Sequence, residues 1–133
     1  MLKIASPLPR ERMLNMSSLA LAHTGDAVFE LLVRTKLVTD GRLTASKLHR
    51  QTVEYVRAGK QAEMAKKIAP LLTEEEQSVY TRGRNSHVSH VPKGCTPGEY
   101  GAATGLEALF GWLYLSGMAE RIEELFTACM ADE

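Results

Sequence analysis

Apolar residues recur every three or four positions along most of this chain, which is the spacing that buries one face of an α-helix. The first long helix is predicted over residues 17–38, and Gly41 ends it. One row of residues shares a face of this helix: Leu19, Ala22, Asp26, Phe29 and Val33. The middle one is a carboxylate, whose burial is costly without a partner. The pattern therefore predicts a partner for Asp26.

A second helix, predicted over residues 100–115, repeats this arrangement. Its row again has a carboxylate in the middle: Tyr100, Ala103, Glu107, Phe110 and Tyr114. Glycine and alanine residues adjoin both carboxylates, and small residues let two helices approach closely. Asp26 and Glu107 are therefore expected on facing apolar stripes of two closely packed helices.

Two such acids repel each other unless a proton or a cation lies between them. Oxygen ligands with open coordination positions favour a hard ion such as Mg²⁺ or Mn²⁺. Asp26 and Glu107 are thus candidate ligands of one metal ion. The alternative is that each acid pairs with a separate Arg or Lys, or reaches solvent at the rim of its helix, and the spacing leaves both interpretations open.

Caps and helix breakers place the remaining elements. An irregular start or a short helix is expected over residues 1–14, which contain two prolines. Thr44 caps a second helix, Gly59 allows a bend into a third, and that helix ends near Pro70. Capping boxes, each a threonine followed three residues later by a glutamate, open two further helices: Thr73 with Glu76, and Thr96 with Glu99.

The end of the chain is also predicted to be helical. Gly117 stops the helix that begins after Thr96, and a last amphipathic helix covers residues 119–130. A loop over residues 85–95 separates the two capping-box helices. No segment shows sustained alternation with period two, so the sequence predicts an all-α fold, with one domain over residues 1–133 and a core over about 15–130.

Charge is neutral overall but unevenly distributed. Residues 34–67 hold nine Lys and Arg against three Asp and Glu, whereas residues 94–133 hold one Arg against seven acids. Residues 82–93 contain Arg82, Arg84 and Lys93 and no acid. A local basic surface can bind a polyanion although the net charge is zero. An ordinary solvated surface is the alternative for both basic segments.

Several other sites and locations are disfavoured by the residue pattern. Cys95 and Cys129 match no disulfide or metal motif and are expected to be packing or loop residues of a reduced, cytoplasmic protein. No apolar run approaches the roughly 20 residues of a membrane span, and the N-terminus lacks the apolar core of a signal peptide. His87, His90 and Cys95 lack a fourth zinc ligand nearby, so the histidines are expected to face solvent or a ligand.

A family resemblance rests on the two acidic segments. Gly25-Asp26-Ala27 and residues 106–114 (Leu-Glu-Ala-Leu-Phe-Gly-Trp-Leu-Tyr) resemble the two metal-binding segments of the ribonuclease III domain. With Arg82-Gly-Arg-Asn85 and Gln61-Ala-Glu63 between them, the chain resembles the Mini-ribonuclease III branch, the bacterial form made of the catalytic domain alone. The resemblance spans roughly residues 15–118, with the elements in the same order.

The resemblance implies a dimeric, helical ribonuclease III endonuclease domain in which Asp26 and Glu107 are catalytic Mg²⁺ ligands (Mn²⁺ being the alternative ion). Two protomers would form a valley for double-stranded RNA, which is hydrolysed to 5′-phosphate and 3′-hydroxyl ends. The implied substrate is the 23S ribosomal RNA precursor. The loop residues that suit RNA phosphates and hydroxyls are Arg82, Arg84, Asn85 and Lys93. No double-stranded-RNA-binding domain is expected, so these residues would supply the grip.

The chain departs from full-length ribonuclease III at two positions. Ala22 and Thr104 occupy places where that form carries further acids, which implies a looser ion with more water ligands. His23 and Thr104 are expected to support the two ligands from outside. The missing acids also motivate an alternative function, a non-cleaving dimer that binds structured RNA or helps ribosome assembly, with a ribosomal protein or subunit as partner. A helical protein-interaction module without an RNA role is a third alternative.

Overall fold

In the computed structural model, which describes residues 2–41, 43–86 and 90–131, the chain forms helices joined by short turns, with no strand in those ranges. The elements in chain order are α1 (Arg10–Leu14), α2 (Ser18–Asp40), α3 (Ala45–Val56), α4 (Ala58–Ile68), the 3₁₀ turn η1 (Ala69–Leu71), α5 (Glu74–Arg84), α6 (Pro97–Leu115) and α7 (Ala119–Met130). The predicted all-α class is confirmed. None of these helices is long and apolar enough to cross a membrane.

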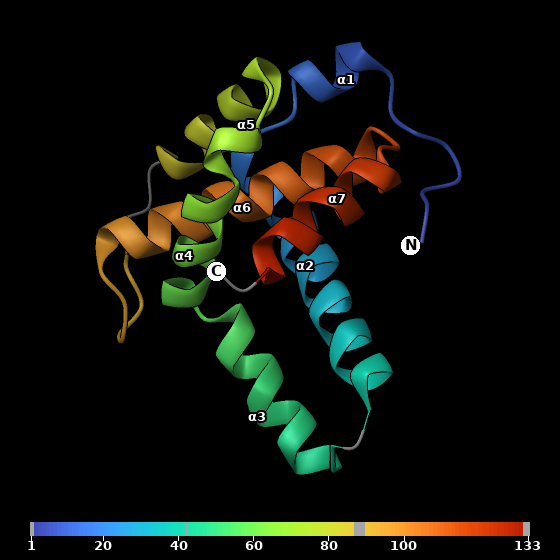
Figure 1. The fold of residues 1–133 in the computed structure, drawn as a ribbon. Coiled ribbons are helices and arrows are strands. Elements are labelled where there is room, and N and C mark those ends of the chain that lie inside the picture. The colour runs from blue at the N-terminus through green and yellow to red at the C-terminus, as the bar shows by residue number, and fades with distance from the viewer. Residues whose placement is uncertain (1, 42, 87–89, 132–133) are drawn as a thin grey trace.

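Helix α6 runs through the middle of the molecule, and α2, α4, α5 and α7 pack around it (Figure 1). From Ala103 to Leu113 every residue is buried except Glu107. Because neighbours cover α6 on all sides, its apolar residues form no single stripe. The ring of Phe29 on α2 lies 5.7 Å from that of Phe110 on α6, and the ring of Phe126 on α7 packs edge-on against Phe29.

The predicted caps are present. Thr44 accepts a hydrogen bond from the backbone N–H of Lys47, and both threonine–glutamate capping boxes form with reciprocal hydrogen bonds. Gly117, which follows α6, has φ of 78°. Residues that carry a side chain rarely adopt this left-handed backbone conformation, which explains why a glycine ends the helix.

The predicted face of α2 needs correction. Leu19 is 52% exposed and Asp26 is also exposed, so the row that contains them lies at the edge of the buried surface rather than at its centre. The buried face is centred on Gly25, where α2 meets α6: Leu21, Ala22, Gly25, Val28, Phe29, Val33 and Leu37. The backbone contact between α2 and α6 at Gly25 fixes the rotation of α2 about its axis, and the spacing of apolar residues did not predict this rotation.

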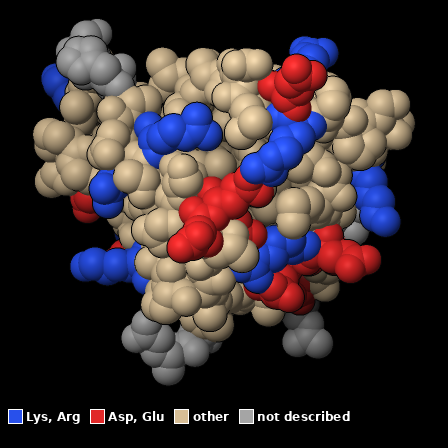
Figure 2. Space-filling model, turned by 90° about the horizontal axis from the view of Figure 1, so that it is seen from above, with Lys and Arg blue, Asp and Glu red and all other residues tan. Residues whose placement is uncertain are grey.

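Helix α3 lies at the lower end of the molecule in Figure 1, away from α5, and packs on α2 and α4. Only Thr52 of this helix is buried, and Lys47, His49 and Arg50 are exposed. The face seen from above in Figure 2 carries basic and acidic side chains next to one another, so its described residues form no continuous basic surface.

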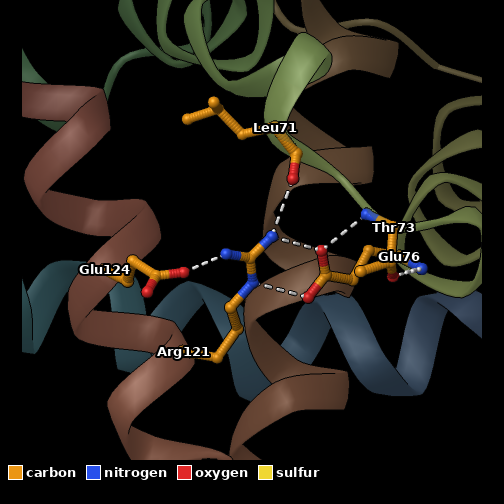
Figure 3. Close-up of polar contacts among 5 residues, drawn as sticks. All are labelled: Leu71, Thr73, Glu76, Arg121 and Glu124. Atoms are coloured by element: carbon orange, nitrogen blue, oxygen red, sulfur yellow. Dashed lines mark hydrogen bonds and ion pairs between the residues drawn. The ribbon is translucent and has the colours of Figure 1, made fainter.

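A partly buried ion-pair cluster joins α7 to the start of α5 (Figure 3). The guanidinium of Arg121 donates to both carboxylate oxygens of Glu76 at 2.8 Å and to the carbonyl oxygen of Leu71 at 2.8 Å, and it also pairs with Glu124. Glu76 is also the acceptor in the capping box of Thr73. The side chain of Glu76 is 3% exposed, so its charge depends on these donors.

Candidate active site

Helices α2 and α6 cross with their backbones in contact. A Cβ atom at Gly25 would lie 1.5 Å from the carbonyl oxygen of Glu107, and one at Gly111 would lie 1.9 Å from the carbonyl oxygen of Leu21. No side chain fits at either distance, so the crossing requires glycine in both helices. This approach carries the residue after Gly25, which is Asp26, to the side of Glu107.

The two acidic side chains interact directly. Burial raises the pKa of Glu107 to about 8, and the negative charge of Asp26 and a hydrogen bond between the two carboxyl groups act in the same direction. Asp26 is exposed and Glu107 is partly buried, so the pair lies where the core meets solvent. Without a cation, burial and the charge of Asp26 therefore favour the protonated form of Glu107.

Gln61 on α4 is a third polar group at this position. Its Nε2 donates to the backbone oxygen of Val56 at 2.8 Å and to Oε2 of Glu107 at 3.4 Å. The side chain is buried, and this hydrogen bond lowers the pKa of Glu107, against the effects of burial and Asp26. In the sequence this residue stands out only as part of the family resemblance. The pattern that could have indicated Gln61 is its place as the one polar residue in the buried row of α4, which consists of Gln61, Met64, Ala65 and Ile68.

The donor set suits one hard divalent ion. Asp26 and Glu107 offer only oxygen atoms, and a cation bound by both would replace the proton that Glu107 otherwise retains. Within the described parts of the chain no three His, Cys, Asp or Glu side chains group as a metal site. Mg²⁺ commonly keeps several water ligands and binds through one or two carboxylates, so this pair fits it.

The two residues expected to support the pair, Thr104 and His23, differ in burial. Thr104 is buried, and its hydroxyl donates to the carbonyl oxygen of Tyr100 at 3.0 Å, one turn back in α6. Ala22 is buried against the core. His23 is exposed and lines an open depression on α2 together with Asp26 and Leu31. The hydroxyl of Thr104 is therefore bound within its own helix, whereas His23 shares the solvent-facing surface of Asp26.

Arg82 and Arg84 lie in the last helical turn of α5, which packs against α6. A Cβ atom at Gly83, between Arg82 and Arg84, would lie 2.8 Å from the Cβ of Ala108 and 2.9 Å from the Cα of Gly105. Gly105 and Ala108 come before and after Glu107 in α6. The contact therefore packs the end of α5 against the part of α6 that carries Glu107. Arg82 and Arg84 themselves are exposed.

Two neighbouring groups hold Arg84. Its guanidinium lies 5.9 Å from the centre of the Tyr80 ring, and its Nε donates to the side-chain oxygen of Asn85 at 3.4 Å. Asn85, which ends α5, and Lys93 are exposed as well. His87 lies outside the described residues, and His90 is exposed. The four predicted RNA-binding residues are thus all exposed, and three of them, Arg82, Arg84 and Asn85, lie at the end of α5.

Comparison with known proteins agrees with these features. Residues 19–118 match the model of the ribonuclease III domain. A Mini-ribonuclease 3 of Symbiobacterium thermophilum is 42% identical over 127 residues, covering 96% of this chain and 93% of that relative. A Mini-ribonuclease 3 of a Thermoanaerobacter species is 46% identical, covering 89% of this chain and 83% of that relative. A crystal structure of a Fusobacterium nucleatum protein superimposes with a TM-score of 0.79 at 34% identity, covering 85% of this chain and 90% of that chain.

Proposed function

The chain belongs to the ribonuclease III family of endoribonucleases, and we propose that it is a Mg²⁺-dependent enzyme that uses Asp26 and Glu107 to hydrolyse double-stranded RNA. The observation that carries the proposal is the interacting carboxylate pair at the crossing of α2 and α6. Its position at the solvent-exposed edge of the core would let both an ion and an RNA phosphate reach it.

In this mechanism the two carboxylates hold the ion. A bound divalent ion would lower the pKa of the attacking water and offset the charge that develops on the phosphate. Asp26 and Glu107 come from two helices in backbone contact, so their relative position is fixed before substrate binds. His23, on the same exposed surface as Asp26, is proposed to contact the ion's water ligands, and Thr104 to position the adjacent turn of α6.

Arg82, Arg84, Asn85 and Lys93 are proposed to bind the duplex. Double-stranded RNA presents phosphates and 2′-hydroxyl groups across a shallow minor groove, so it is recognised mainly by shape. Guanidinium and ammonium groups suit phosphates, and the amide of Asn85 suits a hydroxyl. The contact of Gly83 with α6 would place Arg82 and Arg84 next to the helix that carries Glu107.

The finer assignments extend the family activity. We propose that the substrate is the 23S ribosomal RNA precursor, that the products carry 5′-phosphate and 3′-hydroxyl ends, and that a homodimer provides one valley for both strands. Exposed Leu19 and Leu31 on α2 are apolar groups that a second copy would cover. A ribosomal protein or subunit is a further proposed partner, and maturation of this precursor would place the protein in the cytoplasm.

A cleavage assay tests the proposal. The wild type is incubated with a labelled RNA duplex and Mg²⁺, beside Asp26→Asn and Glu107→Gln. Each variant is expected to lose at least about 100-fold in rate, as when one charge-stabilising group is removed from an enzyme. Asp40→Asn makes the same chemical change at the exposed end of α2 and is expected to cleave normally.

The same assay separates the main alternative. The alternative is motivated by Ala22 and Thr104, which stand where full-length ribonuclease III has acids: the protein would bind structured RNA without cutting it. A wild type that shifts the duplex on a gel and leaves it intact at saturating Mg²⁺ would support that binder. Duplex binding that is absent at low salt would instead support a protein-interaction module.

A further inference from the structure

We propose that Gln61 is a positioning residue of the metal site, which holds Glu107 in the orientation that a divalent ion requires. The inference rests on the proposed function, because it assumes that Glu107 is a metal ligand. It is carried by the two hydrogen bonds that the Gln61 amide donates, one to α3 and one to Glu107. Gln61 itself touches neither the ion nor the substrate in this role.

The carbonyl of Val56 fixes which way the amide of Gln61 faces. Nε2 lies 2.8 Å from this oxygen. If the amide were turned over, Oε1 would face the carbonyl at a similar distance, and two acceptors would then meet without a proton between them. The amide is therefore held with its N–H groups toward Val56 and Glu107. Glu107 accepts this hydrogen bond at Oε2, and a carboxylate has further lone pairs with which it could bind an ion.

Burial of Gln61 adds a second argument. The residue is 2% exposed, and its Oε1 is buried without a hydrogen-bond partner among the described residues. An unsatisfied buried acceptor destabilises a fold, so an apolar side chain of similar size would suit the row of Met64, Ala65 and Ile68 better. Functional sites commonly retain residues that are unfavourable for packing. The hydrogen bond from Gln61 to a candidate metal ligand is consistent with such a role.

Metal binding tests the inference without requiring catalysis. Mn²⁺ is titrated calorimetrically into the wild type and into Gln61→Met, which keeps the volume and removes the donor. The variant is expected to bind Mn²⁺ about 10-fold to 100-fold more weakly, which is the usual effect of losing a partner that orients a metal ligand. Its melting temperature is expected to be unchanged or higher, because Val56 is partly exposed and water can bond its carbonyl.

Two further variants complete the design. Gln61→Asn keeps the amide on a side chain that is too short to reach both acceptors, and it is expected to weaken Mn²⁺ binding. This variant tests the inference if Gln61→Met fails to fold. Gln77→Met makes the same substitution at an exposed position of α5 and is expected to bind as the wild type does. In cleavage assays, Gln61→Met is expected to need about 10-fold more Mg²⁺ for half-maximal rate.

The outcomes distinguish this inference from the function on which it rests. Folded Gln61 variants that bind Mn²⁺ as tightly as the wild type would overturn the positioning role while leaving the metal site intact. A lower melting temperature with an unchanged Mn²⁺ constant would likewise overturn it and assign Gln61 to structure alone. A wild type that neither binds Mn²⁺ nor cleaves RNA would overturn the proposed function itself.

Discussion

The backbone of Glu107 touches the backbone of Gly25: a Cβ atom on Gly25 would lie 1.5 Å from the carbonyl oxygen of Glu107. One residue further along α2, Asp26 reaches the side chain of Glu107. The carboxylate pair therefore exists because glycine allows α2 and α6 to cross in contact.

Gly25→Ala is expected to destabilise the fold by about 3 kcal/mol, the upper end for an overpacked core, because the added methyl group overlaps the backbone of α6. Urea denaturation measures the change. Gly98→Ala, in the exposed first turn of α6, meets only the Thr96 hydroxyl at 3.8 Å and is expected to be neutral or stabilising. Equal unfolding midpoints for the two variants would show that the crossing tolerates separation.

Stability without divalent ions is expected to fall as pH rises toward about 8. Burial and Asp26 raise the pKa of Glu107 in the folded protein above its ordinary value of 4.5. The folded state thus holds a proton that the unfolded state releases, so this stabilisation is complete below that ordinary value and is lost as pH passes through the folded pKa.

Melting curves in a chelator check this pH dependence. Glu107→Gln removes the ionisation, so its advantage in melting temperature over the wild type is expected to grow between pH about 5 and pH about 8. Mg²⁺ at pH about 8 should stabilise the wild type and leave the variant nearly unchanged. Parallel pH profiles of the two proteins would contradict the raised pKa.

Arg121→Met is expected to destabilise the fold by about 3–5 kcal/mol, because it leaves the buried carboxylate of Glu76 without its cation. Denaturant titration near neutral pH measures the loss. Glu124→Gln removes only the exposed partner of Arg121 and is expected to cost less than about 1 kcal/mol. Similar losses in the two variants would show that burial of Glu76 does not set the strength of this cluster.

The effect of Arg121→Met is also expected to shrink in acid. Hydrogen bonds from Arg121 hold the pKa of Glu76 below its ordinary value. The pair therefore contributes stability above that ordinary value and loses it as pH falls through the lowered pKa. Repeating the denaturant titration at pH about 3 should bring the wild type and the variant closer together, and a constant difference would contradict the shift.

Replacing Arg82, Arg84 and Lys93 together with alanine is expected to weaken duplex binding and flatten its salt dependence by about one unit of slope for each RNA phosphate that the protein no longer binds. Filter binding over a salt series measures the slope. The control carries the same charge change in the N-terminal segment: Lys3, Arg10 and Arg12 to alanine. Melting curves check that both triple variants fold, and equal slopes would exclude Arg82, Arg84 and Lys93 as the residues that bind the duplex.

The sequence by itself determined the helices and most of their ends, although α3 and α4 separate at Arg57 and not at the predicted Gly59, which lies inside α4. Thr73 and Thr96 form capping boxes with glutamates three residues later, and Gly117 adopts the positive φ that stops α6. These signals act between residues a few positions apart, so they can be read from the chain order. The small residues around Asp26 and Glu107 also predicted a close helix pair, because the absence of a side chain is visible in the sequence.

Only the tertiary structure decided which face of each helix is buried and which groups meet. Leu19 fits the apolar row of α2 yet is exposed, because contact at Gly25 sets the rotation of the helix. Gln61 reaches Glu107 across 46 positions of sequence, and Arg121 reaches Glu76 across 45. Such contacts depend on the packing of several helices around α6, and no local spacing encodes that arrangement.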